Sequence, residues 1–214
     1  MRNPLPAVGL AVLLVLSACS VVNGSGQVAT ETRQVNGFTR IDLAGTGEVT
    51  VERGDSESLT IEADDNVLAR LTSEVSNSTL KLGTKRGITI NTKNPIRYRV
   101  TVKDLTGVAV SGAGSVKGQG MTLQMFAVDI SGSGMVQLSG SAVEQDIEVS
   151  GSGRYQAADL MSEKVTAEIS GSGQIEIAVS RELTVDISGS GTITYSGDPR
   201  VEQSISGSGR VIKK

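Results

Sequence analysis

Four carboxylates recur at nearly equal intervals in the second half of the chain, each two residues before a Ser-Gly-Ser-Gly tetrapeptide. They are Asp129, Glu148, Glu168 and Asp186. Carboxylate oxygens are preferred ligands of Ca²⁺, so a strip of these side chains could hold calcium, and a calcium-dependent rise in melting temperature would test that hypothesis. The alternative interpretation is a solvated acidic face, screened by water and by nearby Lys or Arg side chains.

The composition gives little support to enzymatic catalysis or to nucleic-acid binding. The chain has no His, which excludes Ser-His-Asp and Cys-His arrangements. Ser78 and Lys81 match an S-x-x-K spacing, but an offset of three on a strand places two side chains on opposite faces. A carboxylate-based, polysaccharide-active enzyme stays an open alternative. It needs two carboxylates at a defined separation in one groove, and spacing in the sequence does not show such a separation. The net charge of −3, without a basic cluster, argues against a nucleic-acid partner.

The tetrapeptides that follow the carboxylates define a period of 18–20 residues. They begin at Ser131, Ser150, Ser170, Ser188 and Ser206, and a Ser-Gly-Ala-Gly variant begins at Ser111. Self-similarity at a fixed period of this size indicates one structural unit stacked on the next.

Each repeat has the pattern of extended chain that goes once around a narrow core. A β-branched residue precedes each tetrapeptide, as at Ile130 and Val149, and apolar residues recur two positions away. Spacings of two place these side chains on one face of a strand. Nineteen extended residues span about 60 Å, enough to return one strand spacing higher. The sequence therefore predicts an all-β, single-chain parallel β-helix (β-solenoid), right-handed, with 18–20 residues per coil.

The tetrapeptide is interpreted as a corner of the coil. If the alternation of sides continues, both glycines face inward, where a bend leaves no room for a side chain, and both serines face outward. If one glycine adopts a positive φ, which glycine does readily, a serine could turn inward. The stacked serines would then be either small residues that suit a corner or a weak hydroxyl-rich platform for glycans or cell-wall polymer.

The first residues indicate export. Residues 1–18 are expected to be a lipoprotein signal peptide, because Leu16-Ser17-Ala18-Cys19 resembles the bacterial lipobox, in which the cysteine is lipidated. An ordinary secretory signal or a short membrane anchor is the alternative. Lipidation of Cys19 implies a membrane tether in the cell envelope, on the outer membrane where the host has one. Residues 19–34 are predicted to be a flexible tether.

Residues 35–214 are predicted to form the head domain, with less regular coils over 35–105 and regular coils over 106–214. The segments Val35–Phe38 and Ala44–Val49, together with the serial tetrapeptides, resemble the bacterial head GIN domain of auto-transporter adhesins. That resemblance implies a β-helix on an exported protein and brings no catalytic residues or cofactor. The predicted function is a non-enzymatic, adhesin-like interaction surface for an envelope or cell-surface polymer or protein. The alternative is a structural or signalling-associated envelope component without a ligand of its own.

Overall fold

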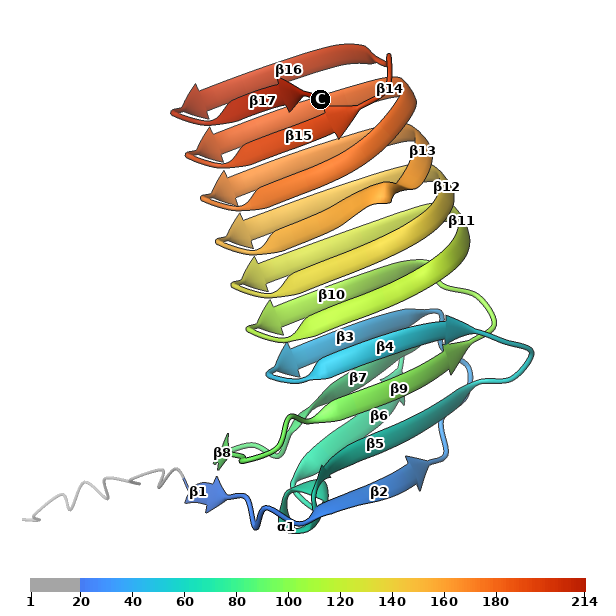
Figure 1. Cartoon of the computed structure of the whole chain (residues 1–214), viewed down its shortest axis with the longest axis vertical. Helices are drawn as coiled ribbons and strands as arrows, with labels where there is room; N and C mark the ends of the chain where they lie inside the picture. The colour runs from blue at the N-terminus through green and yellow to red at the C-terminus, as the bar shows by residue number, and fades with distance from the viewer. Residues whose placement is uncertain (1–19) are drawn as a thin grey trace, which may run out of the picture.

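The computed structural model describes residues 20–214, most of which are in β-strands (Figure 1). The elements are β1 (Ser20–Asn23), β2 (Val28–Arg33), β3 (Arg40–Gly45), β4 (Glu48–Arg53), β5 (Ser58–Asp64), α1 (Asp65–Leu68), β6 (Leu71–Ser76), β7 (Thr79–Thr84), β8 (Ile88–Asn91), β9 (Arg97–Val102), β10 (Gly107–Gly112), β11 (Ser115–Gly132), β12 (Met135–Gly151), β13 (Arg154–Gly171), β14 (Gln174–Gly189), β15 (Thr192–Ser196), β16 (Arg200–Gly207) and β17 (Arg210–Lys213).

The regular repeats form a parallel β-solenoid, which confirms the predicted fold class. Strands β11 to β14 each contain 16 to 18 residues and bend around the core as one coil. The parallel ladders align the repeats as the sequence period requires: Ser131 pairs with Ser150, Ser150 with Ser170, and Ser170 with Ser188. Equivalent residues therefore form columns along the solenoid axis.

The N-terminal strands form a mixed cap beneath the coils. Strands β3 and β4 stack in parallel under β10 and β11 and rest in turn on β7 and β9. Strands β2, β5 and β6 pair antiparallel to their neighbours. Within the segment expected to be a flexible tether, the described residues include two paired strands: β1 pairs with β8 and β2 pairs with β5. A polar Asn-Gly-Ser-Gly stretch resembles a linker, but here it only joins two short strands.

A buried carboxylate holds strand β5 of the cap to the loop between β8 and β9. Asp64, at the end of β5, is fully buried and accepts hydrogen bonds from Asn94 Nδ2 at 2.6 Å and Thr92 Oγ1 at 3.0 Å. The bond from Asn94 is the main reason that the pKa of Asp64 lies below its usual value, with Thr92 and backbone N–H groups contributing, against the opposing effect of burial. The ionised carboxylate is therefore part of the folded cap.

The core lies between the two sheets of each coil and follows the predicted alternation. Val110, Ile130, Val149, Ile169 and Ile187 are all buried. Filling the narrow core with β-branched side chains suits pleated, half-buried strands and explains why so few aromatic residues suffice.

One coil carries polar groups inside this core. Gln145 occupies the column of Phe126 and Val165 and is fully buried. Its Oε1 accepts the hydroxyl hydrogen of Tyr155, and its Nε2 donates to Ser162 Oγ. Every polar atom of this trio has a partner, as a buried polar group requires.

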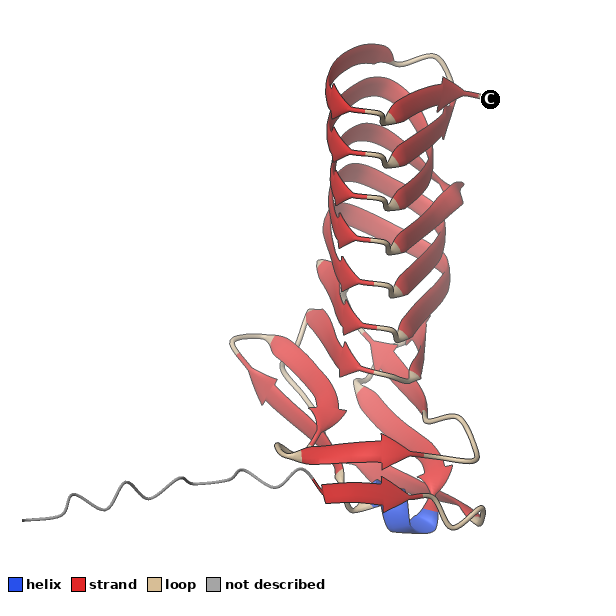
Figure 2. Cartoon of the chain, turned by 90° about the vertical axis from the view of Figure 1, so that its left-hand side faces the viewer, coloured by secondary structure: helices blue, strands red, loops and turns tan. Residues whose placement is uncertain are grey.

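The tetrapeptide forms the predicted corner of the coil (Figure 2). Its two glycines differ in conformation and burial. The first glycine has a positive φ, for example +114° at Gly132, and a Cβ there would lie 2.8 Å from Gly112 O. The second is buried, and a Cβ on Gly153 would lie 2.3 Å from Ile130 Cγ2. Both serines stay exposed, so only the second glycine faces inward and neither serine does. The ladder continues through the corner: Ser152 N donates to Gly132 O at 2.8 Å.

Candidate functional site

The predicted acidic column exists and is in register. Asp129 pairs with Glu148, Glu148 with Glu168, and Glu168 with Asp186 on adjacent strands, and all four side chains are exposed. Arg40 reaches across Gly107 to Asp129, with an Nη2–Oδ2 distance of 3.2 Å. Within residues 20–214, the other three carboxylates of the column make no salt bridge. Like charges opposite one another on neighbouring strands are destabilising.

The column does not gather into a compact metal site. Among the described residues, no group of three or more His, Cys, Asp or Glu side chains converges closely enough to hold a metal ion. A cation on the column would have to bridge carboxylates of successive coils. The calcium strip therefore stays a prediction, and the register of the column is the part that is confirmed.

A hollow of about 660 Å³ lies beside the acidic column, on the same outer face. Its apolar part is formed by Met125, whose surface is 71% exposed, and by the edge of buried Phe126. Its polar part is formed by Arg40, Glu144, Asp146 and Glu168. The hollow is therefore acidic, with Met125 as an exposed apolar side chain in its lining.

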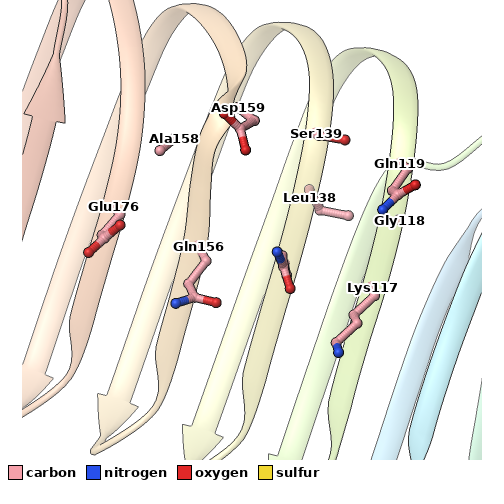
Figure 3. A pocket seen from close by; sticks show the side chains of 10 residues that line it. Lys117, Gly118, Gln119, Leu138, Ser139, Gln156, Ala158, Asp159 and Glu176 are labelled. Carbon is pink, nitrogen blue, oxygen red and sulfur yellow. The ribbon is translucent and has the colours of Figure 1, made fainter.

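A second hollow, of about 390 Å³, lies on the other sheet and crosses four successive coils (Figure 3). We call it the amide groove. One side is a column of outward side chains from β11, β12, β13 and β14, whose register makes Lys117, Gln137, Gln156 and Glu176 direct neighbours. The other side contains Gln119, Ser139 and Asp159, where the coils bend. Buried Leu138 lies at its base.

Irregular pairing at the bend creates the amide groove. The register between β11 and β12 shifts between Gly118 and Met121, and that between β12 and β13 shifts between Gln137 and Ser139. Shifts of this kind are β-bulges, which bend the strand and redirect side chains. Gln119, Ser139 and Asp159 consequently project beside the regular column.

The groove contains two carboxylates, which bears on the enzyme alternative. Glu176 lies 3.8 Å from Lys214 Nζ and Asp159 is exposed. Glycoside cleavage by paired carboxylates places one of the two in an apolar enclosure, and both of these side chains face solvent. The groove therefore offers hydrogen-bonding groups and opposite charges rather than a catalytic pair.

The serine columns are exposed along the corner of the coils. Ser131, Ser150, Ser170, Ser188 and Ser206 are stacked in register. Tyr155 is fully buried, as its inward position in the repeat predicted. The hydroxyl platform thus lacks an exposed aromatic side chain from this position, and the corner role explains the serines without a ligand.

Cys19, the predicted lipidation site, lies outside the described residues. Of the residues that are described, none belongs to a helix with the length and apolar character that crossing a bilayer requires.

Sequence reasoning missed the amide groove. Its regular column could have been found from Lys117, Gln137, Gln156 and Glu176, which each lie six residues after the first Ser of the preceding tetrapeptide. The bulges that bring Asp159 and Ser139 beside this column have no constant spacing in the sequence. The sequence therefore contains a signal for the regular column of the groove but none for the residues at the bulges.

Comparison with solved structures supports the fold. The structure of a putative adhesin from Bacteroides fragilis is 24% identical, with a TM-score of 0.69, and the match covers 90% of this chain and 99% of that one. A putative adhesin from Parabacteroides merdae is 19% identical, with a TM-score of 0.53 and coverage of 91% and 99%. A putative lipid binding protein from Parabacteroides distasonis is 24% identical, with a TM-score of 0.52 and coverage of 91% and 100%.

These identities are low enough that the likeness shows a shared fold and no more. A search of curated proteins finds no match. The family model described as "putative auto-transporter adhesin, head GIN domain" matches residues 37–199, which include the cap strands from β3 onward and the coils up to β15. Because this match spans well over half of the sequence, the chain belongs to the head GIN domain family.

Proposed function

We propose that the protein is a non-enzymatic, adhesin-like module of the cell envelope, which is tethered to a membrane through a lipid on Cys19 and binds an envelope or cell-surface polymer. Family membership supports the adhesin-like role. The observation that carries the binding proposal is the amide groove, which presents equivalent side chains from four successive coils.

The chemistry of the amide groove suits a hydrated polymer. Each glutamine amide both donates and accepts hydrogen bonds, and Gln137 and Gln156 are direct neighbours in the ladder. Lys117 and Glu176 add one charge of each sign at the ends of the column. The groove is lined, among residues 20–214, without an aromatic side chain, so recognition would rest on hydrogen bonds. Binding per site would be weak and would gain from many copies on one surface.

Binding of purified peptidoglycan, as an insoluble polymer rich in hydroxyl and amide groups, tests the groove. We expect the chain to co-sediment with it and the double variant Gln137→Ala/Gln156→Ala to lose most of this binding. Thr166→Ala/Thr184→Ala is the matched control, because these two exposed side chains lie on the outer face that carries the acidic column. Loss of binding in the control, with retention in the glutamine variant, would place the contact on the acidic face and contradict the proposal.

The tether has its own experiment. When the whole gene is expressed with its leader, mass spectrometry should find a lipid-modified Cys19 as the first residue of a membrane-associated protein. The variant Cys19→Ser should accumulate either in the soluble fraction or as a precursor that keeps its leader. An unmodified cysteine on a soluble wild-type protein would disprove the anchor while leaving the groove proposal intact.

A further inference from the structure

The last coil of the solenoid exposes side chains that every other coil buries. Leu183 and Ile187 of β14 are fully buried, whereas their ladder partners in β16, Val201 and Ile205, are 36% and 41% exposed. The difference arises because β16 and β17 cover the coil below, while no described strand covers them. The terminal coil therefore exposes, on its outer side, the kind of surface on which the other coils stack.

The backbone of the terminal coil is equally unpaired on this side. Strand β16 pairs only with β14, and β17 only with β15, within the described chain. An uncovered strand edge is a template for a further strand. Lysine side chains can block such an edge, but Lys213 is held by Asp198 at 2.5 Å and Lys214 lies 3.8 Å from Glu176. Lys213 is therefore engaged by its own chain, whereas the longer contact of Lys214 leaves its ammonium group able to pair with a carboxylate of a partner.

The opposite end of the solenoid differs, which restricts what can cover the open coil. Strands β2, β5 and β6 are antiparallel to their neighbours, and α1 packs beside them. A second copy stacked head to tail would therefore meet no matching parallel coil. The matching surface on a second copy is its own terminal coil, and contact between like ends closes after two copies.

We propose that the terminal coil β16–β17 is a docking surface for the same coil of a second copy, tail to tail. The two copies would be related by a two-fold axis that is parallel to the strands and lies midway between β16 and β17. This axis places β16 next to the partner's β17, and the two strands run in opposite directions. Antiparallel strands accept this pairing. The same operation lays β17 on the partner's β16, so both open edges are paired at once.

Alignment of the two corners sets a register that matches apolar with apolar and plus with minus. Ile205 then faces the partner's Val211, both on the inward side of the coil. Glu202 faces the partner's Lys214, and Ser208 at the corner faces the partner's Ser208. The two cores become continuous, and the charges at the edge attract. Because one coil end is a small surface, we expect a weak, concentration-dependent dimer.

The position of this surface gives the dimer a consequence for adhesion, which rests on the proposed function. The terminal coil lies at the far end of the solenoid from β1, which follows the tethered residue (Figure 1). Tail-to-tail contact would then join chains on two facing membranes. The dimer itself does not depend on the tether or on the amide groove.

Sedimentation equilibrium of the chain from Ser20 to Lys214, which holds every described strand, tests the dimer. We expect the average mass to rise toward two copies with concentration. The variant Ile205→Lys/Val211→Lys should stay monomeric. Met125→Lys is the matched control, because Met125 is more exposed than Ile205 but lies on the outer surface of β11, several coils away from β16; it should dimerise like wild type. A monomer at all concentrations, or growth beyond two copies, would overturn the proposal.

A symmetric cross-link tests the register. The Ser20–Lys214 chain has no cysteine, so Ser208→Cys introduces a single thiol on the proposed axis. With glutathione disulfide as the oxidant, it should form a covalent dimer. Ser190→Cys, at the same exposed corner position one coil below, should remain monomeric. Equal cross-linking of both variants would contradict the register.

Bead aggregation separates the adhesive consequence from the groove. Beads that carry the chain by its N-terminus should cluster, and Ile205→Lys/Val211→Lys should abolish clustering while peptidoglycan binding is unchanged. A dimer in solution without bead clustering would remove the adhesive consequence alone. Loss of peptidoglycan binding by Gln137→Ala/Gln156→Ala, with clustering intact, would show two independent surfaces.

Discussion

Tyr155 donates its hydroxyl hydrogen to Gln145 Oε1 in the interior of the solenoid, where both side chains are fully buried. A glutamine in a column of Phe and Val is thus explained by the tyrosine that the next coil inserts. Removing the acceptor alone leaves a buried hydroxyl without a partner. We expect Gln145→Leu to lower the free energy of unfolding by about 1–3 kcal/mol in urea titrations.

The double variant Gln145→Leu/Tyr155→Phe is the control for this pair. It removes donor and acceptor together, and Ser162 Oγ can still donate to Leu160 O. Much of the lost stability should return, because an apolar replacement of both partners leaves no orphaned hydroxyl. Additive losses in the double variant would show that the hydrogen bond is not what stabilises this coil.

Alkaline pH should weaken the cap through Tyr98. Burial raises the pKa of Tyr98 to about 12, whereas a tyrosine in an unfolded chain titrates near pH 10. The folded state therefore keeps a proton that the unfolded state releases, and stability that is complete below pH 10 falls as the pH rises toward 12. Tyr98→Phe should flatten the fall in urea titrations by up to about 1.4 kcal/mol per pH unit. Tyr195→Phe, at a half-exposed position, should keep the wild-type slope.

Acid should weaken the cap through Asp64. The pKa of Asp64 is lowered in the fold, chiefly by the hydrogen bond from Asn94. Its contribution to stability is therefore present above the pKa of an unfolded aspartate, near 3.9, and is lost as the pH falls through the lower folded value. Melting temperatures from pH 6 to pH 2 should fall less steeply for Asp64→Asn than for wild type. The exposed Asp198, whose pKa Lys213 lowers, gives the control Asp198→Asn, which should leave cap melting unchanged.

Neutralising one carboxylate of the acidic column should stabilise the solenoid. Glu148 lies between Asp129 and Glu168 on adjacent strands. Glu148→Gln removes two like-charge neighbours and should raise the unfolding free energy by roughly 0.2–1 kcal/mol at low salt. Asp129→Asn should not, because it loses the salt bridge to Arg40. High salt should shrink the difference, and a gain that is independent of salt would contradict this account.

The same variant tests the calcium hypothesis. Melting in millimolar calcium against a chelator should show a rise in wild type that Glu148→Gln reduces. No shift in wild type would remove the calcium strip and leave the solvated acidic face as the interpretation.

The second glycine of each tetrapeptide should tolerate no side chain. The Cβ of Gly153→Ala would lie 2.3 Å from Ile130 Cγ2 in the coil below, and overpacking of this kind costs about 1–3 kcal/mol. Ser152→Ala, at the neighbouring exposed position, should be nearly neutral. Equal unfolding free energies for the two variants would mean that the corner adjusts more freely than this packing indicates.

The sequence predicted the parts of the structure that repeat and missed the parts that do not. The tetrapeptide period fixed the register, so that Glu148 and Glu168 were placed opposite one another correctly. The sequence could not predict which of the two glycines adopts a positive φ and which faces inward. Gly132 has the positive φ and lies against the carbonyl of Gly112, which is a contact between different coils. The amide groove and the strands β1 and β2 depend on bulges and non-local pairing, which leave no period to detect.

The unbroken ladder through the corners has a mechanical consequence. Each coil is hydrogen-bonded to the coil beneath it along most of its perimeter, with interruptions only at the bulges of the bend. A load on the C-terminal end would peel windings away singly, each releasing about 60 Å of chain. The antiparallel base at the N-terminal end would unfold last, so the molecule could lengthen under tension while its base stays folded.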